Sequence, residues 1–183
     1  MTKTSYDYFS VNLEIKDKSS DLYSVLDSGI LYGYGVFETI LIQEGKPVLM
    51  TYHYDRMMYG ASLLEIHMTY SQEEIEKNVQ ELIDKNGVKD GVINFYMSIE
   101  RGPNITFRMD YGEPLLLMVV RPKPDYDLSK RYKLTVREES FQRVRLDQIK
   151  TMSYLKNLME KRLAHQFDEV LLFDQEGYVH ETT

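Results

Sequence analysis

The feature that most constrains the fold of this sequence is a helical pattern closely followed by a strand pattern. Residues 71–86 carry apolar side chains at helical spacing, and residues 91–100 alternate between apolar and polar side chains. Ser71 and Glu74 form the capping-box pattern that begins a helix, and Gly87 is typical of a helix end. A helical pattern that is followed within a few residues by a strand pattern predicts a mixed fold in which helices pack on a sheet.

Further apolar segments extend this layer as far as a proline-rich break. Residues 36–42 are typical of a strand that turns back through a glycine-containing loop into 47–50, and residues 51–66 are typical of a helix. Residues 115–120 form a continuous apolar run, which predicts a strand buried on both faces. The two prolines within 121–125 lack amide donors and favour extended backbone, which indicates a linker.

The break divides the chain into two expected domains. We expect a small α/β domain over residues 1–120 and an interdomain linker over 121–128. A second domain covers 129–183 and begins with a strand over 132–137.

The composition excludes several classes of function. The chain has 183 residues, of which 43% are hydrophobic, a fraction sufficient for a core. Its formal net charge of −7 argues against a general binder of nucleic acid or of membrane surfaces, because both require a basic face. It has no cysteine for disulfides or thiolate metal sites, and no apolar stretch of signal-peptide or transmembrane type. We therefore expect a soluble protein of the cytoplasm.

A lysine stands just before a helical pattern in the second half of the chain. Apolar side chains recur at helical spacing after Lys150, with Ser153 as the expected N-cap; they are Leu155, Leu158, Met159 and Leu163. The partial positive charge of a helix N-terminus, together with burial, lowers the pKa of a neighbouring lysine and makes its amine a better nucleophile. A short strand over 170–173 and a second one that ends at Glu181 follow. Without further context, a solvated lysine is the commoner state of such a residue.

An arginine lies in the predicted helix 51–66. Arg56 shares a face of this helix with His53, Gly60 and Leu63. Because Gly60 costs a helix interior about 1 kcal/mol relative to alanine, we expect a close approach of another segment at this face. Arg56 is either a solvated surface residue or an anion ligand, since guanidinium offers a planar fork to phosphate oxygens. His53 is interpreted as structural, and with no partner at ligand spacing no metal is expected.

Three motifs occur in this order along the chain. They are YGYGVFET over residues 32–39, His53-x-x-Arg56, and Lys150 with Ser153-Tyr154-Leu155 followed by residues 169–174 and 177–182. Together they resemble the signature of the fold-type IV pyridoxal-phosphate enzymes, the class IV aminotransferase family. The resemblance implies pyridoxal 5′-phosphate as the cofactor, bound by Lys150 as a Schiff base, with Glu181 paired to the pyridine nitrogen. It implies that Arg56 binds the cofactor phosphate. Tyr154 is a candidate hydrogen-bond partner of the phenolic oxygen of the cofactor, or else a core or surface tyrosine.

The resemblance also implies the architecture. Enzymes of this family have an α+β fold of two domains, assemble as dimers with active sites near the interface, and are longer than this chain. We therefore expect a complete small domain, a truncated large domain and a homodimer. Phe37 and Thr39 are expected to line the substrate side.

The reaction stays open between two chemistries. The spacing from Lys150 to Tyr154 resembles that of 4-amino-4-deoxychorismate lyase and of the D-amino acid aminotransferases more than that of the branched-chain enzymes. Residues 103–108 lack the histidine of the carboxylate clamp of the D-amino acid enzymes, and also the second Arg-Gly pair often found in the lyase. We expect the lyase, which releases pyruvate and gives 4-aminobenzoate for folate synthesis. An amino-acid transaminase is the alternative, and a catalytically silent domain that acts as an assembly partner is a further one.

Overall fold

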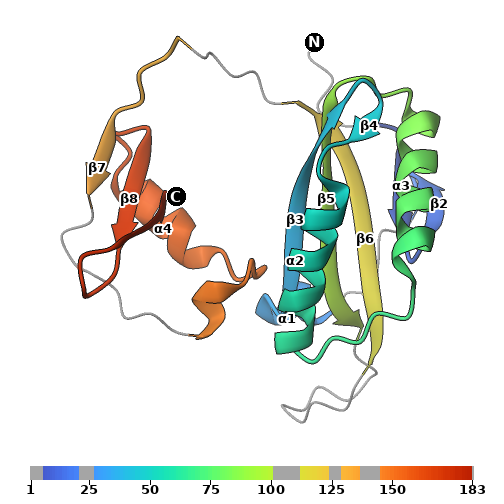
Figure 1. Cartoon of the computed structure of the whole chain (residues 1–183), viewed down its shortest axis with the longest axis horizontal. Helices are drawn as coiled ribbons and strands as arrows, with labels where there is room; N and C mark the ends of the chain where they lie inside the picture. Colours follow the sequence, from blue (N-terminus) through green and yellow to red (C-terminus); the bar gives the residue numbers. More distant parts are fainter. Residues whose placement is uncertain (1–5, 21–26, 101–111, 124–128, 137–144, 183) are drawn as a thin grey trace. The chain divides into compact units, whose positions relative to one another are not determined.

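The computed structural model describes residues 6–20, 27–100, 112–123, 129–136 and 145–182. The chain forms two compact units, residues 1–124 together with 149–152, and residues 125–148 together with 153–183 (Figure 1). The sequence placed residues 129–183 in one domain, but 149–152 group with the first unit because their backbone bonds to a strand there. The mixed α+β class expected from the sequence is confirmed. Residues 103–108, which entered the choice of reaction, lie outside the described residues.

The first unit is built on a six-stranded antiparallel sheet of order β2-β1-β6-β5-β3-β4. Its strands are β1 (Tyr8–Val11), β2 (Glu14–Asp17), β3 (Gly35–Gln43), β4 (Lys46–Pro47), β5 (Gly91–Glu100) and β6 (Glu113–Pro122). The strands predicted over 36–42 and 91–100 are thereby confirmed as β3 and β5. The apolar run over 115–120 is the middle of β6, where the side chains are almost all buried.

Helices cover one face of this sheet. The helices α2 (Met50–Leu63) and α3 (Gln72–Asn86) pack on apolar side chains of β3, β5 and β6 to form the main core (Figure 1). Fully buried members of this core include Ile40, Ile93, Phe95 and Met118. The opposite face carries a smaller cluster that includes Phe9 and Leu117.

The ends of the two helices test the capping predictions. Ser71 and Glu74 form the expected capping box, and Gly87 ends α3 in the left-handed conformation with φ 62°. The start predicted for α2 is wrong, since this helix begins at Met50, a position assigned to a strand. No side chain caps it, and the burial of Met50 in the core accounts for the earlier start.

The glycine-rich segment before β3 forms a short helix, α1 (Ser28–Tyr32), that the sequence did not indicate. Asp27 caps it by accepting from the Ile30 amide at 3.0 Å, and the other carboxylate oxygen accepts from Ser98 Oγ at 2.6 Å. Gly33 then closes the helix with φ 66°. This double use of one buried carboxylate joins α1 to β5.

The second unit is a three-stranded sheet with one α-helix. Its elements are β7 (Leu134–Val136), the 3₁₀ helix η1 (Arg145–Gln148), α4 (Leu155–Leu163), β8 (Glu169–Phe173) and β9 (Val179–Thr182). The strand β8 pairs in parallel with β7 and antiparallel with β9. The prediction of Ser153 as N-cap is wrong, because Tyr154 occupies that position without a capping hydrogen bond. The apolar positions of α4 are exposed within the described structure, as at Leu155 (69%) and Leu163 (73%). No helix among the described residues is long and apolar enough to cross a membrane.

Candidate active site

The segment that carries Lys150 is attached by its backbone to β3. The amide of Phe37 donates to the Lys150 carbonyl at 3.0 Å, and the amide of Met152 donates to the Gly35 carbonyl at 2.8 Å. An antiparallel bridge between Val36 and Thr151 lies between these two bonds. The backbone of β3 therefore fixes the position from which the lysine side chain extends.

Two glycines make room for this attachment. A Cβ added at Gly35 would lie 2.5 Å from the Met97 carbonyl oxygen and 2.6 Å from Met152 Sδ. A Cβ at Gly60 of α2 would lie 3.0 Å from Val36 Cγ1. At least nine in ten real Cβ contacts are longer than the 3.0 Å found at Gly60, so the close approach predicted there is confirmed.

The Lys150 amine lies over an aromatic ring. Its Nζ is 4.3 Å from the centroid of Phe37, and the Phe37 ring stacks on Tyr96 with centroids 6.3 Å apart. The negative face of a ring attracts a cation, so Phe37 holds the half-buried lysine side chain against the sheet. This aromatic contact belongs to the first unit, whereas the helix that follows Lys150 in the sequence belongs to the second, so the expected effect of its N-terminus on the lysine stays a prediction.

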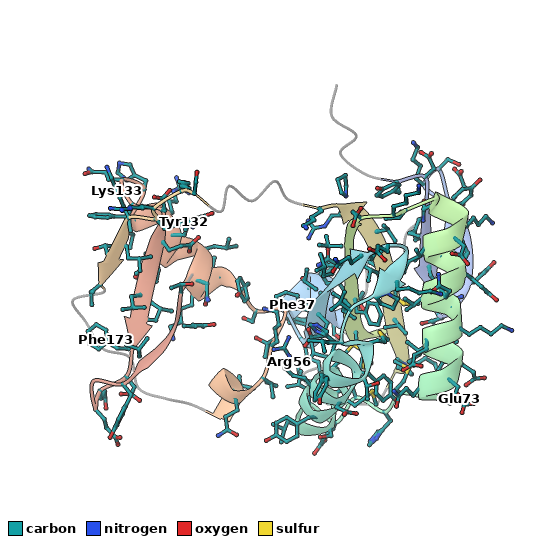
Figure 2. All side chains as sticks on the ribbon, turned by 45° about the horizontal axis from the view of Figure 1, so that its top comes forward. Phe37, Arg56, Glu73, Tyr132, Lys133 and Phe173 are labelled. Atoms are coloured by element: carbon teal, nitrogen blue, oxygen red, sulfur yellow. The ribbon has the colours of Figure 1, made fainter. Side chains whose placement is uncertain are left out.

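Arg56 of α2, which Figure 2 labels together with Phe37 of β3, forms a bidentate ion pair with Glu38, the residue after Phe37. Its Nε and one Nη donate to the two oxygens of Glu38 at 2.6 and 2.7 Å, and His53 Nδ1 lies 2.8 Å from Glu38 Oε2. An ionised carboxylate only accepts, so the histidine is the donor. His53 thus supports the arginine, in keeping with the structural role expected for it.

The charge of Glu38 is stabilised despite its burial. The side chain is 1% exposed. Burial raises the pKa of Glu38, but the hydrogen bonds from Arg56 and His53 outweigh burial, and the pKa lies below its ordinary value. The same pairing raises the pKa of Arg56. Sequence reasoning did not select Glu38, although strand alternation places this carboxylate among the buried side chains of β3, and that position was the available signal.

The Arg56 side chain stays accessible to solvent beside this ion pair. It is 55% exposed, and guanidinium has five N–H donors. Two nitrogens bind Glu38, which fixes the plane of the group. Arg56 is therefore an oriented cation that can still bind an anion.

The other substrate-side candidate, Thr39, lies on the same face of β3 as Phe37. Its hydroxyl accepts from Asn94 Nδ2 at 2.7 Å. Asn94 is 2% exposed, whereas Thr39 is exposed. Thr39 thus joins a buried amide to the open side of the sheet.

The second unit brings together the two remaining candidates. Asn157 of α4, which is buried, donates to Glu181 Oε1 of β9 at 3.2 Å. Burial, the carboxylate of Glu181 and, to a smaller degree, Glu169 raise the pKa of Tyr154. The hydroxyl of Tyr154 therefore stays protonated at neutral pH and can donate a hydrogen bond. Asn157 was missed, although its helical spacing from Tyr154 places both on one face of α4.

The structure thus groups the candidates by unit. Lys150, Phe37, Thr39 and Arg56 are in the first unit, whereas Tyr154 and Glu181 are in the second. Among the described residues, no group of three or more acidic or histidine side chains could hold a metal ion.

The sequence that forms this site also matches a known protein family. Residues 35–183 match the family described as amino-transferase class IV, and the chain therefore belongs to that family.

Two curated relatives and one solved structure give the match its detail. The chain is 32% identical over 161 residues to the aminodeoxychorismate lyase of Bacillus subtilis, covering 83% of this chain and 53% of that protein. It is 28% identical over 172 residues to a D-alanine aminotransferase of Staphylococcus aureus, covering 91% and 60%. A hypothetical aminotransferase from Mycobacterium tuberculosis, solved in its PLP-bound form, has the same fold, with a TM-score of 0.79, 19% identity and coverage of 96% of this chain and 65% of that one. The chain spans about half to three fifths of the length of the two curated relatives.

Proposed function

We propose that the protein is a pyridoxal-phosphate-dependent enzyme that acts on the amino group of a small amino acid or of aminodeoxychorismate. One observation carries the proposal: two neighbouring residues of β3, whose side chains lie on opposite faces of the strand, hold an amine and an oriented guanidinium. The Lys150 amine lies over Phe37, and Arg56 is paired with Glu38. A nucleophilic amine and a permanently charged phosphate ligand are the two groups required by a cofactor that has an aldehyde and a phosphate.

The remaining donor groups suit the same cofactor. The outward donors of Arg56 offer a fork to phosphate oxygens. Glu181, whose carboxylate is oriented by Asn157, suits a ring nitrogen that must stay protonated. The neutral hydroxyl of Tyr154 suits a phenolic oxygen, to which it can donate a hydrogen bond.

Each residue then has a defined task. When bound, the cofactor supplies an electron-withdrawing ring that stabilises charge at the substrate α-carbon. Lys150 would hold the cofactor through its amine and would move the proton at the substrate α-carbon as general base and acid. Phe37 and Thr39 border the substrate on the open face of the sheet.

The lyase reaction is our first candidate. The spacing from Lys150 to Tyr154 and the similarity to the Bacillus subtilis lyase support it. The proposal includes a cytoplasmic homodimer that releases pyruvate and 4-aminobenzoate for folate synthesis. The similarity to D-alanine aminotransferases supports transamination as the second candidate.

The first test is the covalent attachment of the cofactor. Purified protein is mixed with pyridoxal phosphate, its visible absorption is recorded, and borohydride reduction is followed by peptide mapping. We expect a cofactor band and a label on the Lys150 peptide. In Lys150→Ala we expect no band, an activity at least about 1000-fold lower and an unchanged melting temperature. Lys156→Ala, which removes an exposed lysine nearby, is the matched control.

The outcomes separate the possibilities. Loss of the band in Lys150→Ala alone supports the assignment, whereas a band that persists with the label elsewhere refutes it. Folded wild-type protein with no band refutes cofactor binding. Pyruvate formed from aminodeoxychorismate without a keto acid indicates the lyase. Amino transfer that requires a keto acid indicates the transaminase.

A further inference from the structure

The segment that carries Lys150 is held by side chains as well as by its backbone. Ile149 packs against the main core, and a Cβ added at Gly60 of α2 would lie 3.5 Å from Ile149 Cβ. Met152 lies at the other end of the segment and is half-buried. Lys150 therefore stands between two apolar side chains, each of which reaches a place where a glycine leaves room.

The thioether of Met152 lies in a socket whose two walls are Gly29 of α1 and Gly35 of β3. A Cβ added at Gly29 would lie 2.9 Å from Met152 Cε and 3.0 Å from Met152 Sδ. A Cβ added at Gly35 would lie 2.6 Å from the same sulfur. Real Cβ atoms essentially never come closer than 3.0 Å to another heavy atom, so a side chain at Gly35 would displace the methionine, and one at Gly29 would press on its end. The lack of side chains at both walls therefore creates the space that Met152 fills.

A buried carboxylate fixes the α1 wall of this socket. Asp27 is 0% exposed, and its two oxygens cap α1 and accept from Ser98 of β5. Ser28 Oγ also accepts from the Ile99 amide of β5 at 3.2 Å. These bonds join α1 to the sheet and involve no atom of residues 149–152. The socket is therefore built by the first sheet and its short helix, and the lysine segment enters it.

The register of the segment on β3 ties Met152 to Lys150. The bridge between β3 and Thr151 places Lys150 opposite Phe37, and by the same register Met152 lies opposite Gly35. Because side chains alternate along an extended segment, Lys150 and Met152 leave the backbone on the same face. A shift of one residue would turn both side chains to the other face, which would take the amine away from the ring and empty the socket.

The neighbours of Met152 in the chain do not suit the socket. They are Thr151 and Ser153, whose side chains are short and polar. Methionine is unbranched and flexible, and it fills narrow apolar gaps. The register that seats the thioether is therefore the register that places Lys150 over Phe37.

We infer that Met152 is a positioning residue for Lys150. Its thioether, seated between Gly29 and Gly35, sets the register of residues 149–152 on β3 and so holds the lysine amine over Phe37. The consequence for the reactivity of the amine rests on the function proposed above, whereas the anchoring of the segment does not.

Hydrogen exchange in the absence of cofactor tests the anchoring. The Phe37 amide donates to the Lys150 carbonyl, so its exchange reports detachment of the segment. We expect this amide to exchange at least about 10-fold faster in Met152→Ala, because part of the apolar burial of a methionine is lost. Met152→Leu keeps an apolar side chain of similar size and retains most of the protection. Met68→Ala truncates another half-buried methionine packed against the main core and is the matched control.

The reaction with pyridoxal phosphate tests the consequence for the amine. The rate at which the cofactor band appears is measured over a range of pyridoxal phosphate concentrations, which gives a maximal rate and a half-saturating concentration. The first depends on the position of Lys150 and the second on ligands of the phosphate such as Arg56. We expect Met152→Ala to lower the maximal rate at least about 10-fold, since small displacements of a reacting group have effects of this size. The half-saturating concentration stays unchanged, Met152→Leu restores the rate, and Met68→Ala keeps both constants.

Each outcome decides the inference. Exchange of the Phe37 amide that is unchanged in Met152→Ala, or equally faster in Met68→Ala, overturns it. Exchange that is faster throughout β5 as well indicates a general loosening of the sheet and also overturns it, as does a changed half-saturating concentration with an unchanged maximal rate. Should wild type form no cofactor band while exchange responds to Met152 alone, the proposed function fails and the anchoring stands. A cofactor band on Lys150 together with exchange that does not respond to Met152 has the opposite meaning.

Discussion

The two faces of β3 hold their charged groups in opposite ways. On the face covered by helices, Glu38 is 1% exposed, and its oxygens accept from Arg56 and His53. On the other face, two cations rest on uncharged groups, Lys150 on the ring of Phe37 and Arg121 on the amide of Asn94. The comparison teaches that a buried carboxylate orients the cation on one face, whereas uncharged groups orient the cations on the other.

The largest effect on stability is expected from Glu38→Gln. The amide keeps the size of the side chain but turns a donor toward Arg56 and removes the negative charge. We expect a loss of about 2 kcal/mol in the free energy of unfolding, reduced by the partial exposure of Arg56. Urea denaturation measures it. A loss below about 0.5 kcal/mol would show that the covered face does not depend on this ion pair.

The pH dependence of stability sharpens the same comparison. The pKa of Glu38 is lowered in the folded protein, so its contribution is fully present above the ordinary glutamate pKa and is lost as the pH falls through the folded value. We expect the difference in stability between wild type and Glu38→Gln to narrow below about pH 4. Thermal unfolding between neutral and acidic pH measures this difference. A constant difference would contradict the assignment of the charge.

A smaller effect is expected on the open face. Thr39→Val keeps the shape of the side chain and removes the hydroxyl that accepts from Asn94. We expect a loss of about 1 kcal/mol in the free energy of unfolding, because the amide of Asn94 loses its acceptor. Thr39→Ser keeps the hydroxyl and serves as the control. If Thr39→Val proves more damaging than Glu38→Gln, the contrast between the two faces is wrong.

The sequence predicted the covered layer well because local signals and burial agreed there. The capping box at Ser71 and the alternation over 91–100 each determine an element from its own residues. The start of α2 at Met50 was missed. Met50 is buried in the core, and no side chain caps the helix, so the sequence carries no local signal for its first residue. The spacing of apolar residues predicted the helix α4. Their exposure within the described structure was not predictable, because helical spacing does not show whether a partner surface covers them.

The candidate site was predictable in its residue types and less so in its partners. The motifs selected Lys150 and Arg56, but the contacts of these residues come from β3, which lies far away in the sequence. Glu38 and Asn94 were missed because a buried polar residue is recognised by its neighbours, and neighbours on adjacent strands are set by register. The roles of the site residues stay predictions that the variants above test.

The attachment of residues 149–152 to β3 has a consequence for the order of folding. All six strands of the first sheet precede residue 124, so this sheet can form on the growing chain before Lys150 has been synthesised. The contact between Phe37 and Lys150 closes a long loop, whose entropic cost opposes its early formation. The amine therefore reaches a strand that is already in place, and the ability to react is acquired after the scaffold that positions it.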